Sequence, residues 1–121
     1  MFRNLRLVYV TTKDRDEAKS IGETLVKEEF AACANILDGM ESIYRWKGSI
    51  ETDHECILLL KSTYNNLPHL TERVKELHSY EVPCIISFNI AEQEGNADYL
   101  EWLLGSVKKP VSAPITPKTK S

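Results

Sequence analysis

Residues 30–51 read F-A-A-C-A-N-I-L-D-G-M-E-S-I-Y-R-W-K-G-S-I-E, and this stretch decides the fold. Near its end apolar and polar residues alternate, which is the period of a β-strand, so we expect Tyr44 and Trp46 on one face. Lys47 and Gly48 then predict a two-residue hairpin turn, with Gly48 supplying a positive φ. The second half of the stretch is therefore predicted to be a hairpin with two aromatic residues close to its tip.

The predicted turn also fixes which residues face each other across the hairpin. It places Trp46 opposite Ser49 and Tyr44 opposite Glu51. In a regular following strand, four charged residues would share the face of the two aromatic residues: Glu51, Asp53, Glu55 and Lys61. A β-bulge would break that register, and the sequence leaves this alternative open.

The segments on either side of this hairpin predict an α+β fold. Asp14 and Glu17 have the spacing of a capping box at the start of an amphipathic helix, in which Gly22 would allow close contact with the sheet. The predicted elements in order are a strand at 5–11, a helix at 14–28, the two hairpin strands ending at 63, a helix at 65–78, a strand at 84–90 and a short helix after 96. The order βαββαβ with an extra C-terminal helix is that of a ferredoxin-like sandwich.

Length and composition indicate one globular domain over residues 1–105, followed by a flexible tail at 106–121 that contains three prolines and four lysines. The net charge of −3 argues against a nucleic-acid partner. No apolar run is long enough for a signal peptide or a membrane span, so we expect no membrane partner. The odd number of cysteines, three, favours a reducing compartment, and the cytoplasm is the predicted location.

Cys33 and His78, a soft thiol and an imidazole, are the residues best suited by chemistry to copper or zinc. Their spacing of 45 residues matches no ligand motif, and a cysteine among alanines is commonly a small buried side chain. His78 lies at the end of a predicted helix, where it could equally serve to end that helix. No sequence pattern of a nucleophile, a phosphate loop or a dinucleotide site is present, so we predict that the protein is not an enzyme.

Tyr44 and Trp46 could form a ligand platform, but aromatic residues are enriched at protein–protein interfaces. The run from Cys56 to Leu60 is apolar at every position, as in a strand that is covered on both faces. Together these features favour a subunit interface over a site for a ligand alone.

Several motifs occur in the order found in one known family. They are V-Y-V-T-T at 8–12, A-A-C-A-N-I at 31–36, S-I-Y-R-W-K-G at 42–48, L-L-K-S-T at 59–63 and H-S-Y-E-V-P at 78–83. Asn96, Tyr99 and Trp102 complete the pattern. By these residues the chain closely resembles the CutA family of divalent-cation tolerance proteins, and the resemblance covers roughly residues 5–104.

The resemblance implies a homotrimer of ferredoxin-like subunits joined edge to edge, a role in the response to divalent metal ions, and copper binding. It implies Cys33 and His78 as metal ligands, and as lining of a cleft between subunits it implies Tyr44, Trp46, Glu51, Lys61, Tyr80 and Glu81. The alternative is a trimer of the PII type that binds a small anion or metabolite in that cleft. Ser79 stands where the family usually has proline, which is expected to loosen the loop around His78.

Overall fold

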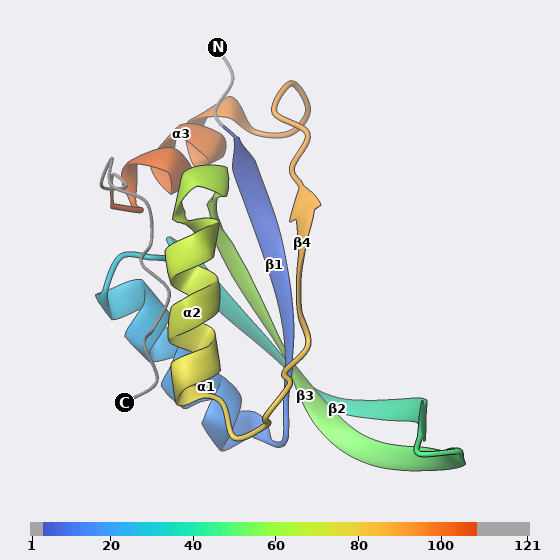
Figure 1. Ribbon diagram of the computed structural model, residues 1–121. Helices are drawn as coiled ribbons and strands as arrows, with labels where there is room; N and C mark the ends of the chain where they lie inside the picture. The colour runs from blue at the N-terminus through green and yellow to red at the C-terminus, as the bar shows by residue number, and fades with distance from the viewer. Residues whose placement is uncertain (1–3, 109–121) are drawn as a thin grey trace.

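The computed structural model describes residues 4–108, in which four strands, three α-helices and one 3₁₀ turn follow one another (Figure 1). The elements in order are β1 (Leu5–Thr12), α1 (Arg15–Lys27), β2 (Cys33–Trp46), β3 (Ser49–Thr63), the 3₁₀ turn (Tyr64–Asn66), α2 (Leu67–Leu77), β4 (Ile85–Asn89) and α3 (Ala97–Gly105). The predicted α+β fold and its βαββαβ order with an extra C-terminal helix are confirmed.

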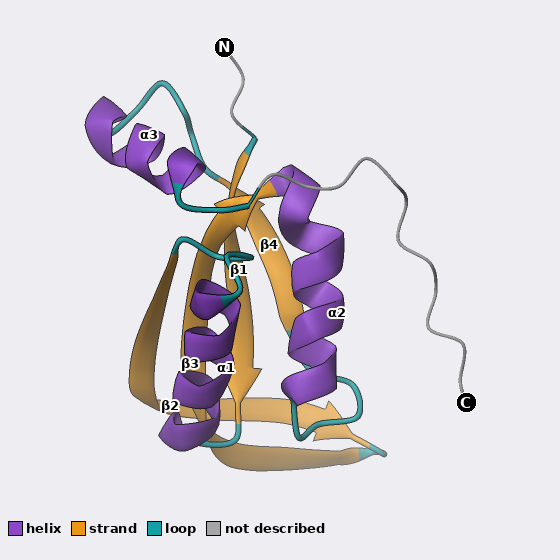
Figure 2. Ribbon diagram, turned by 90° about the vertical axis from the view of Figure 1, so that its left-hand side faces the viewer, coloured by secondary structure: helices purple, strands orange, loops and turns teal. Residues whose placement is uncertain are grey.

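The four strands form one antiparallel sheet in the order β2-β3-β1-β4. Helices α1 and α2 lie side by side on one face of this sheet, as the view in Figure 2 shows from the helix side. The other face carries no helix over most of its length. The described part of the chain contains no helix long and apolar enough to cross a bilayer.

The core lies between the sheet and the two long helices. Alternate residues of β3 point into it, and Cys56, Leu58 and Leu60 are fully buried there. A second, smaller cluster forms where α3 packs on the end of the sheet, around Leu5 and Leu103. The fold thus buries one face of β3 under the helices. The residues of β3 that alternate with Cys56, Leu58 and Leu60 lie on the opposite face of the sheet.

Helix α1 begins as the sequence predicts, because the side chain of Asp14 accepts a hydrogen bond from the Glu17 backbone N–H. Gly22 brings the helix close to the sheet: a Cβ at this position would lie 3.1 Å from the Cβ of Ala34 and 3.2 Å from Leu58. Both expectations for this helix are confirmed. Val26, although apolar, is 39% exposed at the last turn of the helix.

The hairpin follows the predicted turn, and Lys47 and Gly48 both adopt positive φ. Strand β3 keeps its regular alternation, but β2 does not: Leu37 pairs with Ile57 and Met40 pairs with Glu55, so two residues of β2 face one residue of β3. This β-bulge includes Gly39, whose φ is +84°.

The bulge decides which residues share a face of the sheet. Cys33 pairs with Lys61, and Tyr44 pairs with Glu51, and both partners lie on the helix-free face of β3. Counting by twos along β2 would have put Cys33 and Tyr44 on opposite faces. Because of the extra residue, they lie on the same face, as do the four charged residues of β3 that the sequence grouped.

Beyond the bulge the hairpin leaves the body of the molecule. Figure 1 shows this part of β2 and β3 at the lower right, pointing away from the helices. Its apolar side chains are open to solvent, with Ile43 71%, Trp46 60% and Ile50 61% exposed. The arm (residues 40–55) therefore has no covering layer within one chain.

The chain after α3 first returns to the body of the protein. Val107 is buried in the small cluster, the Lys108 backbone N–H donates to Glu29, and the Lys108 carbonyl accepts from the side chain of Asn66. The remaining residues of the predicted flexible tail, 109–121, lie outside the described residues, so that part of the domain assignment stays a prediction.

Candidate functional site

The main candidate site is a cavity of about 520 Å³ in the corner between the arm and the loop that precedes β4. The arm contributes four of its side chains, and the loop from α2 to β4 contributes the opposite wall. The lining residues are Thr11, Tyr44, Trp46, Asp53, Glu55, Tyr80, Glu81, Val82 and Cys84. A cavity of this volume is in the range of small-molecule sites.

Two tyrosines in the cavity donate hydrogen bonds to carboxylates. The Tyr80 hydroxyl lies 2.8 Å from Oε2 of Glu55, and the Tyr44 hydroxyl bonds to Oδ2 of Asp53. The bond to Asp53 raises the pKa of Tyr44 to about 12, and burial together with Glu55 raises the pKa of Tyr80. Both phenols therefore stay protonated and act as donors over the whole physiological range.

His78 is a structural residue in this fold. Only 9% of it is exposed, its Nε2 lies 2.7 Å from the Thr11 carbonyl oxygen, and its Nδ1 accepts the Tyr80 backbone N–H at 3.0 Å. This pattern requires the neutral ring with its proton on Nε2. The ring also contacts that of Tyr80, with centroids 4.7 Å apart. Both ring nitrogens are thus engaged, and a metal at either would replace one of these bonds.

The loop that carries His78 is fixed at a further point by Glu17 of α1. The Ser79 backbone N–H donates to Oε2 of Glu17 at 2.7 Å, while Oε1 caps α1 by accepting from Lys13. Burial would raise the pKa of Glu17, but the bonds from Ser79 and Lys13 outweigh it and lower the pKa below 4.5. A proline in place of Ser79 would have no N–H to donate. The residue that was expected to loosen the loop therefore anchors it.

Cys33 and Lys61 lie near the opposite end of the sheet. Cys33 is half-buried, and its Sγ lies 3.6 Å from the side-chain oxygen of Asn35. Lys61 donates to the Tyr99 hydroxyl at 3.0 Å, which raises the pKa of this lysine, and its ammonium lies 5.2 Å from the Tyr99 ring centre. This part of the site therefore joins the helix-free face to α3.

The two predicted metal ligands do not meet within one chain. Cys33 is level with Lys61 on β3, whereas the Thr11 carbonyl that binds His78 is level with Ile57, which is four residues further along β3. Four residues of strand span about 13 Å. In residues 4–108 no group of three or more His, Cys, Asp or Glu side chains could hold a metal ion.

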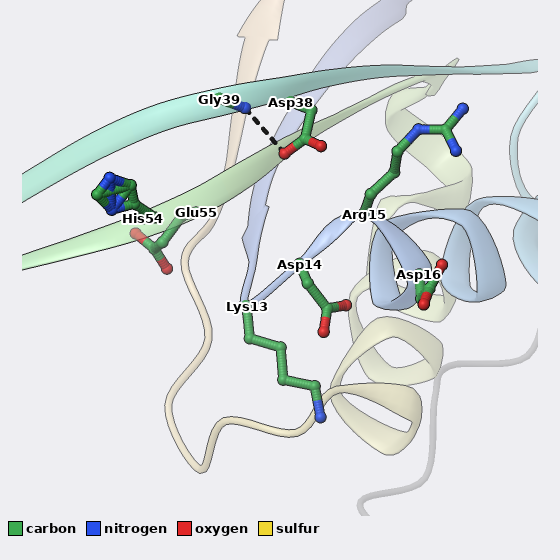
Figure 3. Close-up of a pocket in the computed structure, with 8 residues that line it drawn as sticks. All are labelled: Lys13, Asp14, Arg15, Asp16, Asp38, Gly39, His54 and Glu55. Atoms are coloured by element: carbon green, nitrogen blue, oxygen red, sulfur yellow. Dashed lines mark hydrogen bonds between the residues drawn. The ribbon is translucent and has the colours of Figure 1, made fainter.

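A second hollow of about 330 Å³ lies beside the bulge. Figure 3 shows Asp14, Asp16 and Asp38 spread around it, with the carboxylate of Asp38 turned to the Gly39 backbone N–H, 2.8 Å away. Lys13 and Arg15 also line this hollow. Its acidic side chains are thus dispersed and balanced by basic neighbours, and we assign it no function.

The structure unites four of the six predicted cleft residues: Tyr44, Trp46, Tyr80 and Glu81. Glu51 lies next to them on the arm, while Lys61 is at the other end of β3. Sequence reasoning did not assign Asp53 and Glu55 to the site, although they alternate with Glu51, which the predicted turn places opposite Tyr44, and this was a usable signal. The contact between Glu55 and Tyr80 depends on tertiary packing and had no local signal.

Comparisons with known proteins agree with this architecture. The sequence pattern of the family described as CutA1 divalent ion tolerance protein matches residues 6–106. The divalent-cation tolerance protein CutA of Thermus thermophilus is 47% identical over 97 residues, which are 80% of this chain and 92% of that protein. The CutA 1 protein of Oryza sativa, named as chloroplastic, is 41% identical over 85% of this chain and 57% of its own length.

Solved structures of relatives have the same fold. The divalent cation tolerance protein of Thermus thermophilus superimposes with a TM-score of 0.82 at 44% identity, covering 86% of this chain and 99% of that chain. The chain thus spans nearly all of the bacterial relative and little more than half of the plant one.

We predict that His78→Ala destabilises the protein by about 2 kcal/mol, because it leaves the buried Thr11 carbonyl without its partner. The measurement is urea unfolding followed by circular dichroism. His54→Ala is the matched control: its side chain is exposed, so the expected change is below about 0.5 kcal/mol. Equal effects of the two substitutions would contradict the structural role of His78.

We also predict a pH-dependent contribution from Glu17. Since its folded-state pKa is lowered, the stabilisation is fully present above about pH 4.5 and is lost as pH falls through the folded-state value. Glu17→Gln should lower the free energy of unfolding by about 1 kcal/mol at pH 7, and the gap to the unchanged protein should close as the pH falls below the lowered folded-state pKa of Glu17. Glu23→Gln, on the exposed face of α1, should show little difference at either pH; a gap for Glu17→Gln that persists in acid would disprove the charge effect.

Proposed function

Since the chain belongs to the CutA1 family of divalent ion tolerance proteins, a family that is not one of enzymes, we propose that it acts as a homotrimer in the response to divalent metal ions and binds copper. The observation that carries the proposal is the helix-free face of the sheet. Its central part is apolar, between the charged residues at the two ends of β3, and its edge carries the thiol of Cys33.

The apolar part of this face is made by residues that alternate with the buried core positions. Leu37 is 55%, Ile86 49% and Phe88 50% exposed, and Leu7, Ile57 and Leu59 lie between them in the register. Exposed apolar patches of this extent mark interaction surfaces. Copies of the same chain are the occupants we propose, since Ile43 and Ile50, on the face of the arm that points away from the cavity, also need a cover, and closed symmetric assembly would meet both needs.

Cys33 supports the metal part of the proposal through its chemistry. A half-buried thiol with no disulfide partner is a ligand that soft ions such as Cu(I) prefer. Within residues 4–108 this thiol belongs to no group of three or more His, Cys, Asp or Glu side chains, so the remaining ligands would come from neighbouring copies on the helix-free face. His78 is the weaker candidate, because both of its ring nitrogens already take part in hydrogen bonds.

The cytoplasm is our proposal for the location of this function. All three cysteines are free, and Cys56 is buried in the core without a partner thiol, which suits a reducing compartment. Cell fractionation with an antibody to the protein tests it, and recovery in a membrane-bounded or extracytoplasmic fraction would refute it.

We expect Phe88→Lys to convert the trimer to monomers, because a charged side chain would replace half-exposed apolar surface at the proposed subunit contact. Sedimentation velocity of the full chain measures the change in mass. Val26→Lys is the control, as it adds the same charge to an exposed apolar position on the helix layer. A monomeric unchanged protein, or a Phe88→Lys variant that remains trimeric, would rule out this interface.

We expect Cys33→Ser to abolish tight Cu(I) binding, measured by competition with a chromogenic Cu(I) chelator under reducing conditions. Cys84→Ser is the matched control. Cys84 is also half-buried, but it lies in the loop before β4, at the opposite end of the sheet from Cys33. His78→Ala should weaken binding by less than the Cys33 change. If the Cys33→Ser variant binds copper as the unchanged protein does, Cys33 is not a ligand.

A further inference from the structure

The cavity between the arm and the loop before β4 has a distinct chemical character. It combines three aromatic side chains with three carboxylates, and no lysine, arginine or histidine of the described chain lines it. The aromatic residues are Tyr44, Trp46 and Tyr80, and the acidic ones are Asp53, Glu55 and Glu81. Its other lining side chains, those of Thr11, Val82 and Cys84, carry no positive charge.

The polar contacts within the cavity keep its field negative. Tyr44 and Tyr80 donate to Asp53 and Glu55, and each carboxyl group has a second oxygen that can accept from a ligand. The bond to Asp53 raises the pKa of Tyr44, and burial together with the bond to Glu55 raises the pKa of Tyr80, so both phenols stay protonated as donors. A small anion in this cavity would meet like charge, so the field selects a cation.

The type of cation follows from the shape of the site. A divalent metal ion needs several oxygen ligands at about 2.0–2.6 Å from one point, and the acidic side chains of the described chain form no such group. The volume of about 520 Å³ is also far larger than a bare ion requires. Dispersed carboxylates combined with aromatic walls suit a bulky, weakly hydrated organic cation, which gains from both charge attraction and contact with the rings.

Trp46 already shows this preference within the chain. The ammonium of its neighbour Lys47 lies 5.9 Å from the centre of the Trp46 ring, inside the range of cation–π contacts. Lys47 itself does not line the cavity. The ring thus lies within cation–π distance of one ammonium group on the arm, and its cavity-lining surface is open to the same kind of contact from a ligand.

We propose that this cavity binds a small alkylammonium cation, through cation–π contact with Tyr44 and Trp46 and charge attraction from Asp53 and Glu81. All of these residues come from one chain, and neither Cys33 nor His78 lines the cavity. The site therefore stands independently of copper binding, and its ligand is a different chemical class from the anion expected of a PII-type trimer.

The test uses the full chain with Trp102→Phe as background, so that Trp46 is the only tryptophan and its fluorescence reports on the cavity. Tetramethylammonium is the probe, and tert-butanol is its neutral counterpart of similar shape. We expect a saturable change with tetramethylammonium that weakens as ionic strength rises, and at most a weak, linear change with tert-butanol. Isothermal titration calorimetry of the unchanged protein provides the second readout.

Substitutions then assign the contacts. Glu81→Gln should weaken tetramethylammonium binding severalfold, and Trp46→Leu, followed by calorimetry, by on the order of tenfold. Glu41→Gln removes the same charge from the other face of the arm, where Glu41 pairs with His54, and should leave binding within about twofold. Lys47→Met should leave binding unchanged or tighten it, because it removes a competing cation.

Three results would overturn the proposal: no saturable binding of tetramethylammonium, equal binding of tert-butanol, or equal losses for Glu81→Gln and Glu41→Gln. A titration with Mn²⁺ tests whether the cavity is a metal site instead. If Mn²⁺ binds more tightly than tetramethylammonium and displaces it, the cavity is a metal site and the proposal fails. Sedimentation velocity and Cu(I) competition on the same samples report on the proposed trimer and on Cys33, so their failure is distinguishable from failure of this site.

Discussion

The bulge in β2 is the constraint on which the rest of the structure depends. At Asp38 and Gly39 the strand places two residues opposite one residue of β3, which bends the hairpin out of the sheet. Each later residue of β2 therefore points to the opposite face from the one that regular alternation would give it. Without it, Tyr44 and Trp46 would point to the helix side of the strand. With it, they lie on the helix-free face with Asp53 and Glu55, and the bent arm forms a corner that the loop before β4 closes into a cavity.

The sheet itself is only half covered within one chain, and this imbalance is the physical basis of the proposed assembly. The core under α1 and α2 is complete, with Leu58 and Leu60 fully buried. On the opposite face, Phe88 and Ile86 each leave about half of their surface in water. Covering such residues contributes about 1 kcal/mol each, since full burial of a large apolar side chain is worth about 1.5–3 kcal/mol. Summed over several residues and copies, this favours association.

In the loop between α2 and β4, a residue of a type that often binds metals has a structural role. His78 looks like a ligand by residue type, yet it fastens the loop to β1 through the Thr11 carbonyl and holds the Tyr80 backbone N–H on its other nitrogen. Ser79 adds a bond to Glu17 that a proline could not make. Together these contacts set Tyr80 within reach of Glu55 and so position one wall of the cavity.

The sequence by itself determined the element order, because each element depends on local chemistry: the Asp14 cap of α1, the alternation in the arm, and the Lys47-Gly48 turn that sets Tyr44 opposite Glu51. It also determined the likeness to the family, through motifs carried by consecutive residues. It could not determine the bulge. The alternation of side chains along one strand does not show where an extra residue is inserted, because the insertion is defined only by the pairing with β3. Only the tertiary structure decided that Lys61 lies far from the cavity, that His78 is engaged on both nitrogens, and that Glu55 meets Tyr80. The physical reason is that each of these contacts joins segments distant in the chain, and packing rather than local propensity brings them together.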